Sequence, residues 1–349
     1  MDTQQFEARK REHIQHSLDV ASQAQGLSGL EQVHLVHDAL PDFDFTEIQI
    51  QTHCLGKQLP TPFYVAGMTA GHENAWKMNR TLALACQQRG WAMGVGSQRR
   101  DLETGDGGLL DQWKKLREEV PDLVLFANLG ISQLITAEMS QVQKVVRDLG
   151  AQALVVHTNA LQETMQPEGT PFFRGGFAAL KRACQELGLP VILKETGCGF
   201  SRATLERVSS LGLAAIDLSG LGGTHWGRIE GARAHKNSIH SVASLTFANW
   251  GIPTASSVLF AAEVLPERTE IWASGGVRSG LDAAKLIALG AHRVGYAKPA
   301  LEAALHGEER LHFWMETQEY ELRVALFCTG SKTCHELRHK EGVWKRNGI

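Results

Sequence analysis

A dense run of hydrogen-bonding side chains follows the apolar segment ALVV, which ends at Val156. His157, Asn159, Gln162 and Glu163 fall within seven residues, and the run closes on the sequence QPEG. Imidazole and amide groups at this spacing could orient a polar ligand, and Glu163 could bind Mg²⁺, which proteins usually hold through one or two carboxylates and substrate phosphates. A capped, solvated loop is the alternative interpretation of the same residues.

A single lysine, Lys194, interrupts the apolar segment VILKETG. Lysine is rarely fully buried unless it is paired. The ammonium group could hold a negative charge on a ligand, or it could lie at a rim and bond to Glu195.

Two glycine-rich turns, SGLGGTHW at 219–226 and SGGVRSG at 274–280, could bind phosphate. Glycine lets backbone N–H groups approach a ligand closely, and the N-terminus of a following helix favours an anion. Tight turns that need glycine for their backbone conformation alone are the alternative.

Eight short apolar runs are the elements that would position these residues. They are TPFYVAGM (61–68), WAMGVG (91–96), DLVLFANLG (122–130), ALVVHTN (153–159), PVILKETG (190–197), AAIDLSG (214–220), EIWASGG (270–276) and RVGYAK (293–298). Amphipathic helical segments separate most of them, and runs that are apolar on both faces are typical of parallel strands covered by helices. Eight strand–helix units over about 240 residues favour a (β/α)8 barrel, with a doubly wound open sheet as the alternative.

The residues that end these runs are predicted to line one ligand chamber, because barrel active sites lie at the carboxyl ends of the strands. They are Gly67, Met68, Thr69, Ser97, Gln98, Arg99, Asn128, His157, Asn159, Gln162, Glu163, Lys194, Glu195, Ser219, Thr224, Gly275, Gly276, Arg278, Ala297 and Lys298. Residues 1–60 are predicted to form a helical and hairpin extension that covers the mouth of a barrel formed by residues 61–349.

Composition narrows the class of protein. The net charge of -3 argues against nucleic acid as the main partner, because no excess basic charge is present to displace counterions. The sequence has no apolar run long enough to span a membrane, and its N-terminus lacks the apolar core of a signal peptide, so we expect a cytoplasmic protein. Six cysteines without CxxC pairs predict reduced thiols, with Cys198 the one expected nearest to chemistry.

Taken together and in order, the motifs resemble type 2 isopentenyl diphosphate isomerase. They are RKxEH at 9–13, MTAG at 68–71, MGVGSQR at 93–99, NLG at 128–130, HxNxLQE…QPEG at 157–169, KETGCGFS at 194–201, DLSGLGGTHW at 217–226 and ASGGVRSGLDAAKLIALGA at 273–291. The resemblance spans nearly the whole chain. The RK cluster and HxNxLQE…QPEG are specific to that family, whereas the glycine turns are shared with other FMN barrels.

The resemblance implies an enzyme that carries FMN and Mg²⁺, uses NADPH to reduce the flavin, and interconverts isopentenyl and dimethylallyl diphosphate. The residues implied to contact FMN are Met68, Thr69, Ser97, Asn128, Lys194, Ser219, Thr224, Gly275, Gly276, Arg278 and Ala297, with Gly67 and Lys298 beside them. Those implied to contact substrate are Arg9, Lys10, Ser97, Gln98, Arg99, His157, Asn159 and Gln162, and Glu163 would bind Mg²⁺. Members of the family tend to assemble as tetramers or larger, which implies a homo-oligomer.

The resemblance also implies which residues act in the reaction. Gln162, His157 and Lys194 are the predicted catalytic residues: Gln162 would orient the substrate, and Lys194 would stabilise an anionic reduced flavin that gives and takes back the proton. The sequence departs from the family at His225, where Ser is usual, and at Lys298, where Gly is frequent. These two departures could alter the surroundings of the flavin, so their roles stay open.

Two other functions fit parts of the sequence. An FMN-dependent 2-hydroxy acid oxidase also has GGVR after the seventh strand, but it needs a catalytic His followed by Gly-x-Arg. The nearest match, His225-Trp226-Gly227-Arg228, is out of register by one residue. A flavin- or phosphate-binding module without catalytic activity is the other candidate, against which the full set of polar strand ends argues.

Overall fold

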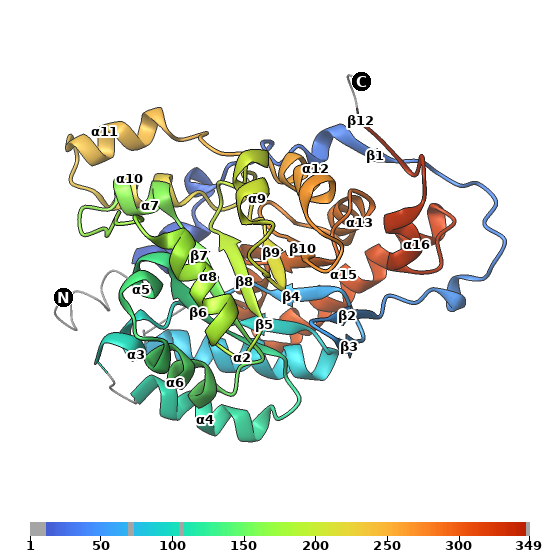
Figure 1. Ribbon diagram of the computed structural model, residues 1–349. Helices are drawn as coiled ribbons and strands as arrows, with labels where there is room; N and C mark the ends of the chain where they lie inside the picture. Colours follow the sequence, from blue (N-terminus) through green and yellow to red (C-terminus); the bar gives the residue numbers. More distant parts are fainter. Residues whose placement is uncertain (1–11, 69–72, 105–107, 347–349) are drawn as a thin grey trace.

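Eight parallel strands close into a barrel at the centre of the molecule (Figure 1). This computed structural model describes residues 12–68, 73–104 and 108–346. The barrel strands are β4 (Phe63–Val65), β5 (Ala92–Gly94), β6 (Leu125–Gly130), β7 (Ala153–Thr158), β8 (Val191–Glu195), β9 (Ala215–Asp217), β10 (Glu270–Ala273) and β11 (Arg293–Tyr296). Each lies within one of the predicted runs. Pairing of β11 with β4 closes the ring, which confirms the (β/α)8 barrel and excludes an open sheet.

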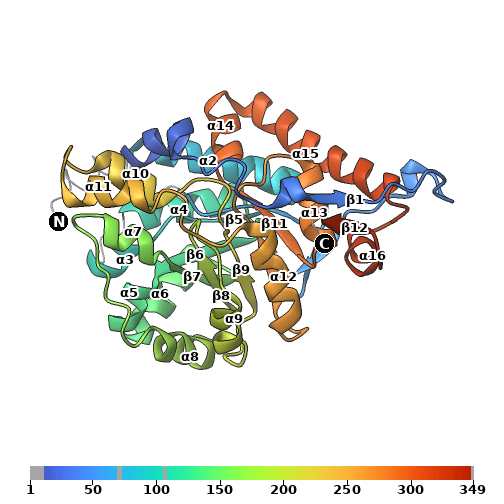
Figure 2. The same cartoon turned by 90° about the horizontal axis from the view of Figure 1, so that it is seen from above.

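Helices surround the barrel (Figures 1 and 2). They are α2 (Glu73–Arg89), α3 (Arg99–Thr104), α4 (Gly108–Glu119), α5 (Ile131–Thr136), α6 (Met139–Leu149), α7 (Ala160–Met165), α8 (Gly176–Glu186), α9 (Arg202–Val208), α10 (Trp226–Arg233), α11 (Ile239–Thr246), α12 (Thr254–Val264), α13 (Gly280–Ala288), α14 (Lys298–Leu305), α15 (Glu308–Cys328) and α16 (Cys334–His339). Their apolar faces pack on the strands and form the larger of two buried clusters. In the described part of the chain, no helix is both long and apolar enough to cross a membrane.

The smaller buried cluster fills the inside of the barrel. Tyr64, Phe126 and Trp272 meet there, with the Trp272 ring centroid 5.0 Å from each of the other two. Large aromatic side chains bury much apolar surface, so these three residues make the interior a packed core and not a channel. The space for a ligand therefore lies between this layer and the carboxyl ends of the strands.

An antiparallel hairpin closes the amino-terminal end of the barrel. It consists of β2 (Thr52–Cys54) and β3 (Lys57–Leu59), and its apolar side chains join the barrel interior. The Leu55 N–H donates to the Glu270 carboxylate at the start of β10, at 2.8 Å. Residues 1–60 thus contain a hairpin, as expected, but it spans residues 52–59 and lies at the end opposite the strand carboxyl termini.

The rest of the N-terminal segment reaches the other end of the barrel and the outer helices. Residues 12–18 are helical and are followed by η1 (Val20–Ser22). His13, Ile14, Ser17, Gln23 and Gln25 lie at the mouth of the barrel. Further along are η2 (Leu30–Gln32), β1 (Val33–Leu35), which pairs with β12 (Trp344–Arg346), and η3 (Phe45–Glu47). The division into an extension and a barrel domain stays a prediction.

Candidate active site

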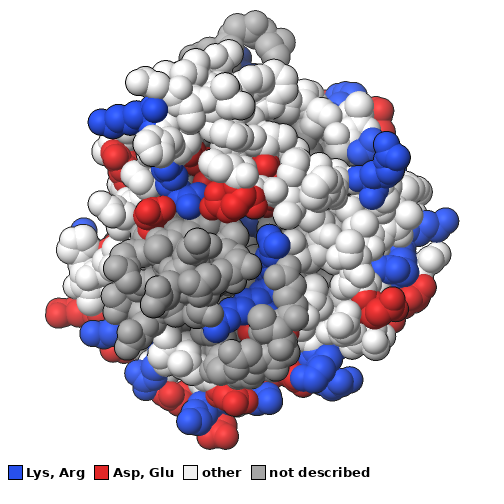
Figure 3. Space-filling model, turned by 90° about the vertical axis from the view of Figure 1, so that its left-hand side faces the viewer, with Lys and Arg blue, Asp and Glu red and all other residues white. Residues whose placement is uncertain are grey.

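A cavity of about 570 Å³ opens at the carboxyl ends of the barrel strands. Residues at or directly after all eight strands line it, as predicted from the positions of the polar strand ends. Its size falls within the range of sites that bind small molecules or cofactors. On the face shown in Figure 3, basic and acidic side chains of the described residues are intermixed, and they form no continuous basic surface there.

Glycines bring the backbones of two loops together at one side of the cavity. Gly275 and Gly276 have φ angles of 97° and 80°, which side-chain-bearing residues rarely adopt. A Cβ atom on Gly276 would lie 2.7 Å from the carbonyl carbon of Gly222, and one on Gly223 would lie 2.6 Å from the Gly276 nitrogen. The two predicted glycine turns therefore pack backbone against backbone, and both line the cavity.

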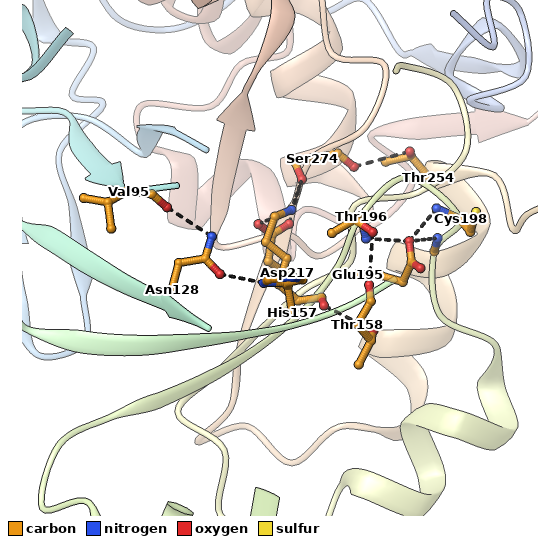
Figure 4. A network of polar contacts seen from close by, with 12 residues as sticks. Val95, Asn128, His157, Thr158, Glu195, Thr196, Cys198, Asp217, Thr254 and Ser274 are labelled. Atoms are coloured by element: carbon orange, nitrogen blue, oxygen red, sulfur yellow. Dashed lines mark hydrogen bonds and ion pairs between the residues drawn. The ribbon is translucent and has the colours of Figure 1, made fainter. Parts of the chain in front are cut away.

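Lys194 reaches the cavity from β8 and is paired from behind. Its Nζ lies 3.0 Å from a carboxylate oxygen of Asp217, which is its register partner on β9. The Ser274 hydroxyl donates to the other Asp217 oxygen at 2.7 Å (Figure 4). The alternative of a rim lysine bonded to Glu195 is therefore wrong: the ion-pair partner is Asp217, which the sequence analysis did not single out.

Glu195 instead organises the loop after β8 (Figure 4). Its carboxyl group accepts the backbone N–H groups of Thr196, Cys198 and Gly199. Burial raises the pKa of Glu195 to about 7, although these hydrogen bonds and the Lys194 charge act in the opposite direction. The contacts fix the loop whose residues Thr196 and Gly197 line the cavity.

Asn128 determines the tautomer of His157. The Asn128 amide donates to the Val95 carbonyl at 3.0 Å, so its oxygen is left to accept from His157 Nδ1 at 2.8 Å (Figure 4). A neutral His157 therefore carries its proton on Nδ1 and its lone pair on Nε2. Both side chains line the cavity, as predicted.

Gln162 is held at both ends of its amide group. Its nitrogen donates to the Glu230 carboxylate at 2.8 Å, and its oxygen accepts from Asn159 at 3.1 Å. Because an ionised carboxylate only accepts hydrogen bonds, Glu230 fixes the orientation of the Gln162 amide. The Asn159 amide also donates to Glu163 at 2.8 Å, and Glu163 accepts from the backbone of Thr170 at 2.5 Å.

Glu230 is the centre of this cluster and has no exposed surface. His13 Nε2 lies 2.9 Å from its carboxylate, and Arg233 forms an ion pair with it. Burial alone would raise the pKa of Glu230, but the hydrogen bond and charge of His13, followed by the charge of Arg233, lower it to about 2. Arg233 also contacts Glu12 and Glu168, so α10 ties the N-terminal helix to the loop after α7.

Most of the predicted residues come together in this cavity. The lining includes Gly67, Met68, Ser97, Arg99, Asn128, His157, Asn159, Gln162, Glu163, Lys194, Ser219, Thr224, Gly275, Gly276, Arg278, Ala297 and Lys298. Gln98 is buried outside the lining, where its backbone and side chain bond to Asn128 and Asp101. The Lys298 Nζ lies 3.4 Å from a carboxylate oxygen of Glu302. Arg9, Lys10 and Thr69 lie outside the described residues.

His225 and Cys198, which the sequence placed near the site, lie outside the cavity lining. His225 is fully buried, with Nε2 3.1 Å from the Trp250 carbonyl, and its Nδ1 caps α10. Burial lowers the pKa of His225, which favours a neutral ring. All six cysteines are free thiols, and burial raises the pKa of Cys198 above its ordinary value.

Comparison with known sequences gives matches at family level. The family model described as FMN-dependent dehydrogenase matches residues 125–344. The isopentenyl-diphosphate delta-isomerase of Legionella pneumophila (strain Corby) is 51% identical over 336 residues, covering 96% of this chain and 97% of that protein. The protein of the same name from Bdellovibrio bacteriovorus is 47% identical over 343 residues, covering 97% and 98%.

Solved structures share the fold at much lower sequence identity. Mandelate oxidase with a difluorinated 2-hydroxy acid has a TM-score of 0.64 and 18% identity, covering 94% of this chain and 96% of that one. A variant of flavocytochrome b2 has a TM-score of 0.68 and 18% identity, covering 97% and 82%. These likenesses concern the barrel architecture alone.

Proposed function

The chain belongs to the isopentenyl-diphosphate delta-isomerases within the FMN-dependent dehydrogenase family, and from that premise we propose that it converts isopentenyl diphosphate into dimethylallyl diphosphate. The observation that carries the proposal is the cluster of Asn159, Gln162, Glu163 and Glu230 beside a cavity of cofactor size. A simple flavin-binding module would have no need for a hydrogen-bonded polar cluster around the buried Glu230, because burying a charged group is costly.

The cavity fits FMN, the cofactor that the FMN-dependent dehydrogenase match supports. The backbones around Gly222, Gly223, Gly275 and Gly276 pack so closely that no Cβ atom fits, which suits a loop pair that cradles a phosphate. Lys194 presents a cation to the same cavity from β8. We assign the flavin contacts to these residues and to Gly67, Met68, Ser97, Asn128, Ser219, Thr224, Arg278, Ala297 and Lys298, with Thr69 beside them.

The isomerisation moves a double bond, so one carbon gains a proton and another loses one. Reduced FMN supplies an acid–base group and an electron-rich face for this chemistry when it is bound. Gln162 orients the substrate, because an amide is not a useful acid at neutral pH. His157 carries its proton on Nδ1 and contacts the substrate through the opposite ring edge. The closed barrel floor and the N-terminal helix at the mouth limit access of water to a carbocation.

Charged groups on the other side of the cavity would anchor the diphosphate. Arg99 and Glu163 both line the cavity, and Asn159 lies 2.8 Å from Glu163. Within the described residues no cluster of three or more His, Cys, Asp or Glu could hold a metal ion. A single carboxylate suits Mg²⁺ only if substrate phosphates complete its coordination, so we propose that Mg²⁺ binds Glu163 together with the substrate. Arg9, Lys10 and Ser97 complete the proposed substrate set, and Gln98 would act on the site through its hydrogen bonds to Asn128.

Three further features belong to the same proposal. NADPH would supply the electrons that keep the cofactor reduced. The protein would act as a homo-oligomer, which the exposed apolar residues Ile239, Val242 and Leu245 on α11 support, with 81%, 57% and 76% of their surfaces exposed. A cytoplasmic location would suit six free thiols, because a reducing compartment keeps thiols reduced.

The structure speaks against a 2-hydroxy acid oxidase. That activity needs a histidine base facing the flavin, and the nearest motif match centres on His225. The His225 ring is buried against the Trp250 carbonyl, and Arg228 bonds to the carbonyls of Ala248 and Gln23. Both side chains are thus engaged in holding the loop after β9.

One experiment tests the proposal directly. The purified protein is reconstituted with FMN, its visible spectrum is recorded, and isomerisation is measured anaerobically with Mg²⁺, with and without a reductant. We expect a yellow protein that is active only after reduction. Full activity of the oxidised or flavin-free protein would contradict the proposed chemistry, and flavin binding without isomerisation would favour the binding module.

A further inference from the structure

A buried ion pair forms part of the cavity wall, with its positive end toward the ligand. Lys194 and Ser274 line the cavity, whereas Asp217 lies behind them and does not. The Lys194 and Asp217 side chains are only 9% and 3% exposed, and their charged atoms lie 3.0 Å apart. Ser274 is bonded to the second Asp217 oxygen, so the carboxylate is fixed in place.

Among the described residues, Asp217 is the carboxylate that forms an ion pair with this lysine. The Glu195 carboxyl is directed to the backbone N–H groups of its own loop. The Tyr64 hydroxyl is buried nearby, and burial followed by the negative charge of Asp217 raises its pKa well above the ordinary value. Tyr64 therefore remains neutral, which leaves the Asp217 charge to act on Lys194 and on whatever occupies the cavity.

We infer that the Asp217 carboxylate, together with Lys194, sets the reduction potential of the bound flavin through the net charge of this cavity wall. The inference rests on the proposed function only in placing FMN in this cavity. A reduced flavin carries a negative charge that the oxidised form lacks, so the net charge of the wall changes the relative affinity for the two forms. The Asp217 carboxylate offsets part of the Lys194 charge, and its burial leaves that effect only weakly screened by solvent.

The alternative is that Asp217 serves only to pair a buried lysine. The two roles differ in what the removal of charge does. A purely structural partner changes stability when it is lost, whereas a charge that acts on the flavin also changes the potential, with a sign fixed by the charge removed. The potential therefore separates the two roles where activity alone would not.

The test uses FMN-reconstituted full-length protein, titrated anaerobically with dithionite in the presence of a reference dye. For Asp217→Asn we expect a higher midpoint potential. The ratio of the affinity for reduced flavin to that for oxidised flavin should rise by a factor of ten or more. That factor corresponds to about 30 mV for a two-electron couple. Lys194→Met should shift the potential by a similar amount in the opposite direction, and the double variant should fall between the two.

Tyr64→Phe is the matched control, because it removes a buried hydroxyl next to Asp217 without removing charge. Its potential should equal that of the unchanged protein, and a shift as large as that of Asp217→Asn would assign the effect to packing and overturn the inference. An unchanged or lower potential in Asp217→Asn would do the same.

Removing one partner of a buried ion pair can prevent folding, so the double variant provides a second test. If Asp217→Asn does not fold, its effect is measured on the Lys194→Met background, where it must still raise the potential; equal potentials there would overturn the inference. Isomerase activity of the unchanged protein is measured in parallel. Its absence would count against the proposed function, while the potentials test Asp217 alone.

Discussion

Glu230→Gln is the change that tests most directly how the polar cluster supports the reaction. Glu230 accepts from Gln162 at 2.8 Å, contacts His13 at 2.9 Å and pairs with Arg233, all without exposure to solvent. Glutamine keeps the size of the side chain but has one accepting oxygen and one donating NH₂ group. At least one donor among the three partners would then face another donor.

The size of the effect follows from the charge of the lost acceptor. A hydrogen bond to a charged group contributes about 1.5–3 kcal/mol. Because about 1.4 kcal/mol corresponds to a factor of ten, loss of the contact that orients Gln162 should lower kcat/KM roughly 10- to 100-fold. We also expect a loss of stability of about 2 kcal/mol, since a buried donor is left without its partner. FMN affinity should stay unchanged, because the glycine loops lie elsewhere in the cavity.

The assay measures isomerisation by the reduced enzyme at several substrate concentrations, together with FMN affinity from flavin fluorescence. Glu12→Gln is the matched control, because Glu12 pairs with Arg233 at 3.0 Å but its side chain is 51% exposed. An exposed ion pair contributes about 0–1 kcal/mol, so this variant should stay within a few-fold of the unchanged enzyme. A folded, flavin-bound Glu230→Gln enzyme with kcat/KM within about twofold of normal would refute the reasoning.

Three other changes have definite expected outcomes. Glu163→Gln should reduce Mg²⁺-dependent kcat/KM by about tenfold or more while the protein stays yellow; loss of flavin would show that the magnesium assignment is wrong. Gly276→Ala places a Cβ atom 2.7 Å from the carbonyl carbon of Gly222 at a φ of 80°, so FMN affinity by fluorescence should fall by about tenfold or more, and unchanged affinity would contradict the phosphate cradle. Burial raises the pKa of Glu195 from 4.5 to about 7. Between these two pH values the folded protein keeps a proton on Glu195 that the unfolded chain releases. The free energy of unfolding should therefore fall by about 1.4 kcal/mol for each pH unit as the pH rises from 4.5 to about 7. Glu195→Gln should remove this slope in thermal unfolding measured at about pH 5.5 and about pH 7.5, and a slope that persists would assign it to another group.

The barrel and the membership of the site could be predicted because parallel strands impose a simple rule. Their carboxyl ends meet at one end of the barrel, so residues such as Asn128 and Lys194 were expected to converge without knowledge of any distance. The residues that these side chains contact were found only in the structure. Asp217 follows Lys194 by 23 positions, and only the register of β8 with β9 brings the two side chains together. That register depends on closure of the whole barrel and cannot be read from either segment alone.

The role of Glu230 could not be predicted from the sequence, for a different reason. It lies on α10, in the segment WGRIEGAR, where a glutamate between Ile229 and Gly231 resembles any residue of a surface helix. Its burial results from packing of α10 against α7 and the N-terminal segment. His13 and Gln162 meet it from two other segments, and Arg233 from the same helix. Contacts between distant segments have no signature at a fixed spacing. The one signal in the sequence was the run of polar side chains after β7, from His157 to Glu163, which needed hydrogen-bond partners elsewhere in the chain.

Neighbouring residues of one motif also diverge in a way that spacing does not reveal. Ser97 and Arg99 line the cavity, whereas Gln98 between them is 4% exposed and bonds to the backbone of the next strand. Ser97 and Gln98 lie in the loop between β5 and α3, and Arg99 is the first residue of α3, so the three side chains do not all face one ligand. A role in orienting Asn128, and through it His157, is therefore open to Gln98 even though direct contact with substrate is not supported by its position.

The protonation states of the cluster bear on where the proton of the reaction originates. Glu230, with a pKa of about 2, is ionised at neutral pH, and Gln162 is an amide whose nitrogen is already bonded to Glu230. Neither group can therefore serve as an acid for an alkene, which is a very weak base. His157 also lines this part of the cavity, and its Nδ1 proton is bonded to Asn128. If His157 were the acid, kcat would fall as pH rises through the imidazole range and His157→Gln would abolish the reaction. A proton supplied by the cofactor predicts instead that His157→Gln raises KM for the substrate and leaves the pH profile of kcat in place.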